Sequence, residues 1–218
     1  MRHSPVVRGP EPATARDIDA INIVFSDAFT DRYHRDGMTG VRVPFLSPEV
    51  WRYALAGAGD GAMVWRDGGG HVVAFNLVHR SGTEGWMGPL AVRADHQGGG
   101  LGRTIVRAGI DWLREGGART IGLETMPRTV DNIGFYSRLG FRPGHLTLTM
   151  AATLPRESPS DPGASLLSAS GAARDAWLDE CRDLLQRLLP GADFSREMAL
   201  TLEHGLGDAA LVRHEGTL

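Results

Sequence analysis

A glycine-rich run separates two segments of the chain that have different hydrophobic periods. Residues Gln97 to Arg103 form this run, Gln-Gly-Gly-Gly-Leu-Gly-Arg. The preceding residues, Gly85 to Val92, are typical of a strand, whereas apolar residues recur at helical spacing from Leu101 onward. Successive glycines let backbone N–H groups converge, and a helix N-terminus adds partial positive charge. This order predicts an anion site, with pyrophosphate as the expected ligand.

The glycine-rich run has two other interpretations. A dinucleotide fingerprint needs a third glycine, but that position is Ile105 when counted from Gly100 and Arg103 when counted from Gly98. The dinucleotide interpretation therefore fails. A flexible glycine loop without a ligand stays open on this segment alone.

The remaining patterns predict an α/β (α+β) domain with a central mixed, mostly antiparallel sheet flanked by helices. We expect a helix from Thr14 to about Phe29, an irregular connection from Thr30 to Pro48, a helix that begins at Leu101 and ends at Gly116-Gly117, and a short helix from Val130 to Arg138. The expected strands are Val6 to Arg8, Ala62 to Trp65, Val72 to Val78, Gly85 to Val92, Thr120 to Thr125 and Leu146 to Met150.

A segment rich in proline, serine and glycine divides the chain. We expect a first domain at 1–152, a linker at 153–164 and a small helical and strand appendage at 165–218. Within the appendage, Trp177, Cys181, Leu184 and Leu188 form the apolar stripe of a helix that needs a partner surface.

The appendage also shows a short internal repeat. Residues 207–216 match residues 59–68 at five of ten positions, with a constant offset. Either the similarity is chance or 165–218 is the opening half of a second copy of the first domain. An incomplete sheet would leave an open strand edge at Ala209 to His214, which favours pairing with another strand, for example in a homodimer.

Composition excludes several classes of function. All 23 basic residues are arginine, so Walker A phosphate binding and lysine nucleophiles are absent. The single Cys181 and scattered histidines make a metal site unexpected. A net charge of −3 argues against nucleic acid, and no apolar run suits a membrane. Nothing in the N-terminal residues directs export, so the expected location is cytoplasmic.

Two segments together resemble the GNAT superfamily of N-acetyltransferases. Gln97-x-x-Gly100-x-Gly102 after a strand resembles motif A, and Asn132 to Phe141, with Tyr136 ahead of Gly140-Phe141, resembles motif B. The resemblance spans about Val6 to Met150 and includes the order of elements. It implies acetyl-CoA as co-substrate and an amine, on a small molecule or a peptide, as acceptor.

The resemblance also implies roles for individual residues. The backbone of Leu90, Ala91 and Val92 would bind the pantetheine arm, and Tyr136 would protonate the departing thiolate. The loop residues Gln97, Gly98, Gly99, Gly100, Leu101, Gly102 and Arg103 would hold the pyrophosphate, with Asn132 as a further cofactor contact.

The identity of the base is left open by the sequence. Glu124 lies twelve residues before Tyr136, a spacing similar to that of the glutamate base in ribosomal-protein N-terminal acetylases of this superfamily. At the end of a largely apolar strand, desolvation would raise the pKa of the Glu124 carboxyl, which is the direction that a general base requires. Glu84 and water are the rivals. Many members of the superfamily have asparagine where this chain has Thr129, which puts the contacts of Thr129 and Asn132 in doubt.

Two functions from different classes follow. The first is direct acetyl transfer from acetyl-CoA to a primary amine in a ternary complex. The second is an acyl-CoA-binding sensor or interaction module without turnover. The acceptor itself is not specified by the sequence.

Overall fold

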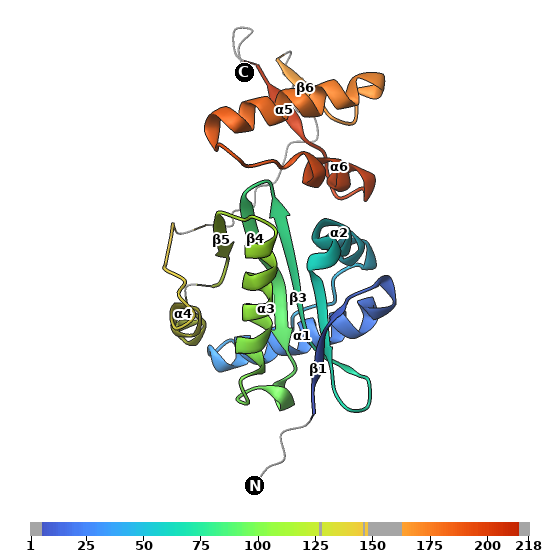
Figure 1. Cartoon of the computed structure of the whole chain (residues 1–218). Helices are drawn as coiled ribbons and strands as arrows, with labels where there is room; N and C mark the ends of the chain where they lie inside the picture. Colours follow the sequence, from blue (N-terminus) through green and yellow to red (C-terminus); the bar gives the residue numbers. More distant parts are fainter. Residues whose placement is uncertain (1–5, 127, 146, 148–162, 214–218) are drawn as a thin grey trace.

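The computed structural model describes residues 6–126, 128–145, 147 and 163–213. They form a larger N-terminal unit and a smaller C-terminal unit that lies against one end of it (Figure 1). The N-terminal elements are β1 (Arg8–Pro12), η1 (Ala15–Asp17), α1 (Ile18–Arg35), α2 (Pro48–Ala58), η2 (Gly59–Gly61), β2 (Ala62–Arg66), β3 (Val72–Ser81), β4 (Glu84–Val92), η3 (Ala94–His96), α3 (Leu101–Glu115), β5 (Thr120–Leu123) and α4 (Val130–Ser137).

The five strands of the N-terminal unit form one mixed sheet in the order β1-β2-β3-β4-β5. The pairs from β1 to β4 are antiparallel, and β5 runs parallel to β4. The predicted mixed, mostly antiparallel sheet flanked by helices is confirmed. A parallel strand after an antiparallel meander requires a crossover, which α3 provides.

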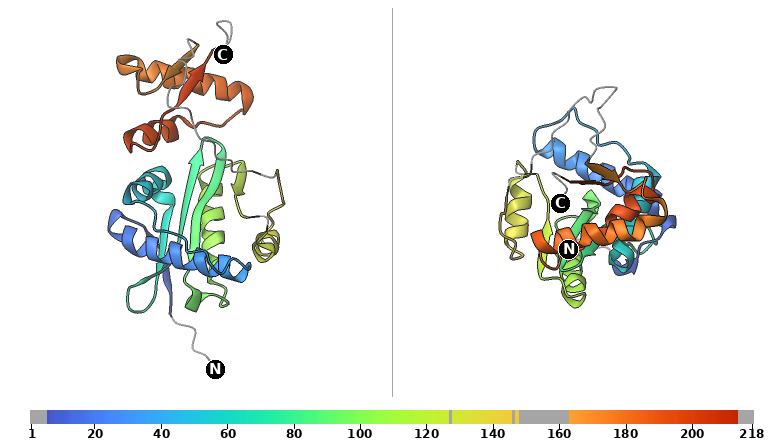
Figure 2. Two further views of the ribbon diagram at one scale, coloured as in Figure 1. Left: turned by 180° about the vertical axis from the view of Figure 1, so that it is seen from behind. Right: turned by 90° about the horizontal axis from the view of Figure 1, so that it is seen from above.

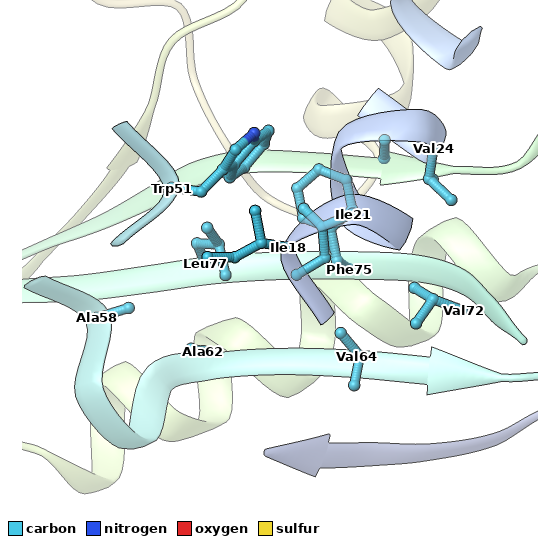
Figure 3. Close-up of a cluster of buried hydrophobic side chains, with 11 residues drawn as sticks. Ile18, Ile21, Val24, Trp51, Ala58, Ala62, Val64, Val72, Phe75 and Leu77 are labelled. Carbon is cyan, nitrogen blue, oxygen red and sulfur yellow. The ribbon is translucent and has the colours of Figure 1, made fainter. Parts of the chain in front are cut away.

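Helices cover both faces of this sheet. On one face α1 and α2 bury a cluster that includes Ile21, Trp51 and Phe75 (Figure 3), with the Trp51 and Phe75 rings edge to face at 5.7 Å. On the other face α3 and α4 pack over Met63, Trp65 and Val73. Figure 2 shows the two helical layers from behind and from above.

Helix α2 is absent from the sequence prediction, and the irregular connection is shorter than expected. Helix α1 continues to Arg35, and α2 begins at Pro48, where the Ser47 side chain caps the Val50 N–H. The remaining connection, 36–47, is tied to α1 by Asn22, which bonds both backbone groups of Leu46, and by Ser26 and Thr30, which bond Val43. These three polar side chains are buried and recur every fourth residue.

The C-terminal unit contains β6 (Ala164–Leu166), η4 (Gly171–Ala173), α5 (Arg174–Leu188), α6 (Ser195–Glu203) and β7 (Ala210–Val212). Strands β6 and β7 pair antiparallel, as β1 and β2 do. The starts of β6, η4 and α5 (164, 171, 174) each lie 156 residues after the starts of β1, η1 and α1 (8, 15, 18). The unit therefore has the element order of the opening half of the N-terminal unit.

The local sequence repeat has an offset of 148 residues, which is also the displacement between the starts of β2 and β7 (62 and 210). The sequence similarity aligns Val212 with Val64, but Val64 is fully buried whereas Val212 is 56% exposed, and Leu211 is buried instead. Helix α6 begins 147 residues after α2 (195 against 48), which aligns Leu211 with Val64. Because side chains alternate along a strand, a shift of one residue exchanges the faces.

Two sequence predictions concern residues that the structure does not describe. The expected strand Leu146–Met150 lies outside the described residues except for Thr147, and the expected linker 153–164 does so except for Gly163 and Ala164.

Candidate active site

Strands β4 and β5 separate along their length. Their paired register ends at Met87 and Leu123, yet β4 continues to Val92. A bulge in β4 lies at the same point, because Asn76 faces Leu90 while Val78 faces Met87. The bulge contains Gly88 and Pro89: a side chain at Gly88 would start 2.4 Å from the Leu77 carbonyl oxygen, so glycine is required. Among the described residues, the β5 side of β4 is unpaired beyond the bulge.

The three residues expected to bind pantetheine lie on this unpaired stretch. Leu90, Ala91 and Val92 pair with Asn76, Phe75 and Ala74 of β3 on one edge. Their other edge faces the gap between β4 and β5. An extended ligand placed there would have the geometry of an added strand.

The glycine loop presents free backbone donors at the start of α3. Gly98 and Gly100 have positive φ angles of 80° and 91°, and Gly100 is the N-cap of the helix. Within the described residues, the N–H groups from Gly98 to Gly102 have no hydrogen-bond acceptor. A Cβ at Gly98, Gly99 or Gly100 would meet no atom within 4 Å, so the space above the loop is open. This arrangement fits a phosphate group.

Side chains at the base of the loop fix its entry. The Gln97 amide donates to the Val92 carbonyl oxygen at 2.8 Å, so this side chain anchors the loop to β4. Arg93 and His96 both contact Asp95, and these contacts, that of Arg93 first, hold the pKa of Asp95 far below its ordinary value. The His96 side chain is only 6% exposed.

Tyr136 lies on α4 and packs against aromatic rings. Its ring centroid is 5.1 Å from that of Phe135 and 5.9 Å from that of Phe141, both in edge geometry. Burial raises the pKa of Tyr136 to about 12. The hydroxyl therefore keeps its proton throughout the physiological range, as a proton donor must.

The two candidate bases occupy opposite ends of the paired part of β4 and β5. Glu124 directly follows β5, is exposed, and accepts a 3.4 Å hydrogen bond from the Thr147 hydroxyl. The expected desolvation of Glu124 is therefore wrong. Glu84 begins β4 beside Thr120, far along the strand from the loop.

Thr129 and Asn132, whose contacts the sequence left in doubt, both form hydrogen bonds within the chain. Thr129 is fully buried and its hydroxyl donates to Asp36 Oδ2 at 2.8 Å. The Asn132 amide donates to the Thr125 hydroxyl at 3.3 Å. Both contacts organise the segment between β5 and α4.

A basic groove between α3 and α4 was not predicted from the sequence. One hollow of about 320 Å³ is lined by Arg103, Arg107, Phe135, Arg138 and Leu139, and a neighbouring one of about 280 Å³ adds Arg114 and Asp111. Within the described part of the chain, none of these four arginines has an ion-pair partner. The helical spacing of Arg103, Arg107 and Arg114 was the available sequence signal.

The described residues contain neither a metal-binding cluster nor a helix that could span a membrane. In the residues that the structure covers, no three His, Cys, Asp or Glu side chains gather closely enough to hold a metal ion. No helix among them combines the length and the apolar character needed to cross a bilayer.

Known proteins resemble this chain in sequence and in fold. Over 136 residues it is 31% identical to the mycothiol acetyltransferase of Actinosynnema mirum, covering 62% of this chain and 43% of the relative. Over 73 residues it is 34% identical to N-alpha-acetyltransferase 30 of Schizosaccharomyces pombe, covering 33% of this chain and 49% of the relative. The chain thus spans just under half the length of each relative.

A solved structure extends the likeness in fold to the C-terminal unit. A protein from Pyrococcus horikoshii matches with a TM-score of 0.63 at 16% identity, over 98% of this chain and 66% of that one. The sequence profile of the Acetyltransferase (GNAT) family matches residues 25–141, which include the split of β4 and β5, the glycine loop and Tyr136. The chain therefore belongs to the GNAT family of acetyltransferases.

Proposed function

We propose that this protein transfers an acetyl group from acetyl-CoA to a primary amine by direct attack within a ternary complex. The proposal rests on two neighbouring sets of backbone groups that are unpaired among the described residues. They are the edge of β4 from Leu90 to Val92 and the N–H groups from Gly98 to Gly102. The first suits the amides of pantetheine and the second suits pyrophosphate. Both belong to one continuous segment.

The basic groove supports binding of the rest of coenzyme A. Arg103, at the loop, and Arg107 and Arg138, further along, lack ion-pair partners in the described residues. If coenzyme A extends from the glycine loop along α3, its third phosphate would lie near these guanidinium groups. Charge-assisted hydrogen bonds from arginine would then add to the affinity.

The chemistry requires two proton transfers. A neutral amine attacks the thioester carbonyl carbon, and the C–S bond of the resulting tetrahedral species breaks to release the thiolate. Tyr136 donates its proton to that sulfur. Glu124 or a water molecule takes the proton from the amine; the exposure of Glu124 favours transfer through water. The names of the relatives suggest two kinds of acceptor, one related to mycothiol and one that carries an α-amine.

The C-terminal unit is proposed to be the opening half of a second copy of the fold, with a structural role. Its element order, the common displacement of 156 residues and the match to the Pyrococcus horikoshii structure support this. The outer face of its two strands, formed by Ala164, Leu166, Ala210 and Val212, is apolar and exposed. All proposed catalytic groups lie within 1–152.

Release of free thiol from acetyl-CoA, measured with a panel of amines, tests the proposal. Amine-dependent thiol release with a stoichiometric acetylated product is expected. Tight acetyl-CoA binding without turnover on any amine would instead favour the alternative, an acyl-CoA-binding sensor.

A further inference from the structure

A buried polar contact joins two helices that are far apart in sequence. Asp36 is the C-cap residue of α1, and Thr129 immediately precedes α4. The Thr129 hydroxyl donates to Asp36 Oδ2 at 2.8 Å across 93 residues of chain. Thr129 is fully buried, and the Asp36 side chain is only 8% exposed. One hydrogen bond thus connects the end of α1 with the start of α4.

Arg32 completes the contact from the α1 side. Its guanidinium bonds Asp36 Oδ1 at 2.5 Å and Asp131 Oδ2, in the first turn of α4, at 3.0 Å. The pKa of Asp36 is lowered, chiefly by the Thr129 hydrogen bond and next by Arg32. The carboxylate is therefore ionised at neutral pH and has a partner on each oxygen.

Helix α4 has few other means of fixing its position. None of its residues is fully buried, and Asn132 bonds only to Thr125, in the segment that leads into the same helix. Phe135 and Tyr136 pack on the sheet, but apolar contacts tolerate small sliding movements more readily than directional bonds do. Together with the bond from Arg128 to the Met38 sulfur at 3.0 Å, the contacts to Asp36 and Arg32 are the polar links that the described residues make between the start of α4 and the end of α1.

Tyr136 follows Thr129 by seven residues, about two helical turns. A small rotation of α4 about its start would move the phenol oxygen relative to the β4 and β5 gap. Proton transfer depends steeply on such distances, and misplacement by about 1 Å can cost roughly 100-fold in rate.

We propose that Asp36 and Thr129 form a positioning pair that fixes α4 and thereby places the Tyr136 hydroxyl for proton donation. The inference rests on the proposed role of Tyr136 as the acid. Neither residue of the pair touches the reacting atoms.

The test compares three substitutions. Thr129→Val keeps the side-chain shape and removes the hydroxyl, Thr129→Ser keeps the hydroxyl, and Asp36→Asn removes the charge. We expect Thr129→Val to lower kcat at least about tenfold while KM for acetyl-CoA stays within about twofold, because the glycine loop is held separately by Gln97. Thr129→Ser should restore most of kcat. Asp36→Asn combined with Thr129→Val should lower kcat no further than the larger single effect.

Combination with Tyr136→Phe separates this inference from the proposed function. If positioning acts through Tyr136, Thr129→Val should change kcat little in the Tyr136→Phe background. A full kcat in Tyr136→Phe alone would overturn the assignment of the acid, and the positioning pair with it. A low kcat in Tyr136→Phe together with an unchanged kcat in Thr129→Val would overturn the pair alone. If Thr129→Val does not fold, Asp36→Asn takes its place in the same comparison.

Discussion

The Thr83 N–H donates a 2.7 Å hydrogen bond to the carbonyl oxygen of Gly191, and this bond joins the two units of the chain. Thr83 lies in the turn between β3 and β4, and Gly191 lies between α5 and α6. The Asp193 N–H donates to the Ser81 carbonyl oxygen at 3.3 Å, and Gly82 forms an isolated antiparallel β-bridge with Ala192. The β3 and β4 hairpin therefore extends into the C-terminal unit through its backbone.

Gly82 is required by this junction. Its φ is +65°, and a Cβ there would lie 2.0 Å from the Gly191 carbonyl oxygen. We expect Gly82→Ala to destabilise the protein by at least about 2 kcal/mol, since backbone strain and a steric clash add. Gly205→Ala is the control, because Gly205 has φ +64° with no atom within 4 Å of its Cβ position. Thermal melts of the two variants should differ clearly; equal melting temperatures would show that the junction yields without cost.

The glycine loop allows charge to be tested without strain. Gly99 has no positive φ and open space at its Cβ position. Gly99→Glu should weaken acetyl-CoA binding about tenfold or more, because it places a carboxylate beside the phosphates. Gly99→Gln, equal in shape and neutral, should bind nearly as well as the parent. Calorimetry measures both affinities, and equal losses in the two variants would contradict the assignment of the pyrophosphate site.

Removal of the Tyr136 hydroxyl tests the acid. We expect Tyr136→Phe to keep acetyl-CoA affinity and to lower kcat by about 10² to 10⁴, the usual range for general acid assistance. Tyr53→Phe removes the same atom from another half-buried tyrosine and should leave kcat unchanged. A loss of less than about tenfold in Tyr136→Phe would mean that the thiolate leaves without this proton.

The contact between Asp17 and Arg66 should make the free energy of unfolding depend on pH. Burial alone would raise the pKa of Asp17, but hydrogen bonds from Arg66 at 2.7 Å and from Thr14 lower it below its ordinary value. A carboxyl whose pKa is depressed on folding stabilises above its unfolded pKa, about 3.9, and loses this contribution as pH falls through the folded value.

Asp17→Asn should therefore cost about 2 kcal/mol at pH 7 and progressively less below pH 4. The control is Asp183→Asn on the exposed side of α5, which should have little effect at any pH. Urea unfolding of both variants at several pH values provides the measurement. A penalty for Asp17→Asn that does not change between pH 7 and pH 3 would contradict the ionic contribution.

Local patterns were sufficient to predict most of the sheet but not all the helices. The apolar runs of β2 and β3, the turn residues between them and the period change at Leu101 are local signals, and the structure has elements there. Helix α2 was not predicted, although Trp51, Leu55 and Ala58 have helical spacing. The start of β1 at Arg8 is set by its pairing with Arg66, which no local signal reveals.

Within the candidate active site, too, local motifs could be predicted from the sequence, whereas contacts between distant segments could not. The glycine loop is a contiguous motif and could be located from its residues alone. The exposure of Glu124 and the contact of Thr129 with Asp36 depend on how distant segments pack, so the sequence could propose their chemistry without specifying their surroundings. The basic groove likewise combines arginines from two helices.

The C-terminal unit provides the last prediction, since its contacts with α2 and the β3 and β4 hairpin are specific. His204 Nδ1 lies 2.6 Å from Glu49 Oε1, Arg196 bonds the Ala56 carbonyl oxygen, and Ser81 bonds Glu197. Helix α2 contributes Trp51 to the main core, so the C-terminal unit contacts a helix that packs into that core.

Deletion of 155–218 should therefore expose apolar surface on the hairpin and α2, lower the melting temperature by several degrees and reduce solubility or change the oligomeric state. Light scattering and thermal melts measure these effects. The acetyl-CoA affinity of the fraction that remains soluble should persist, because the glycine loop and the β4 edge belong entirely to 1–152. Leu188→Ser, at an exposed residue of α5, is the control for a change confined to the surface of the unit. A truncated protein with unchanged melting temperature, assembly and activity would show that the C-terminal unit has no structural role.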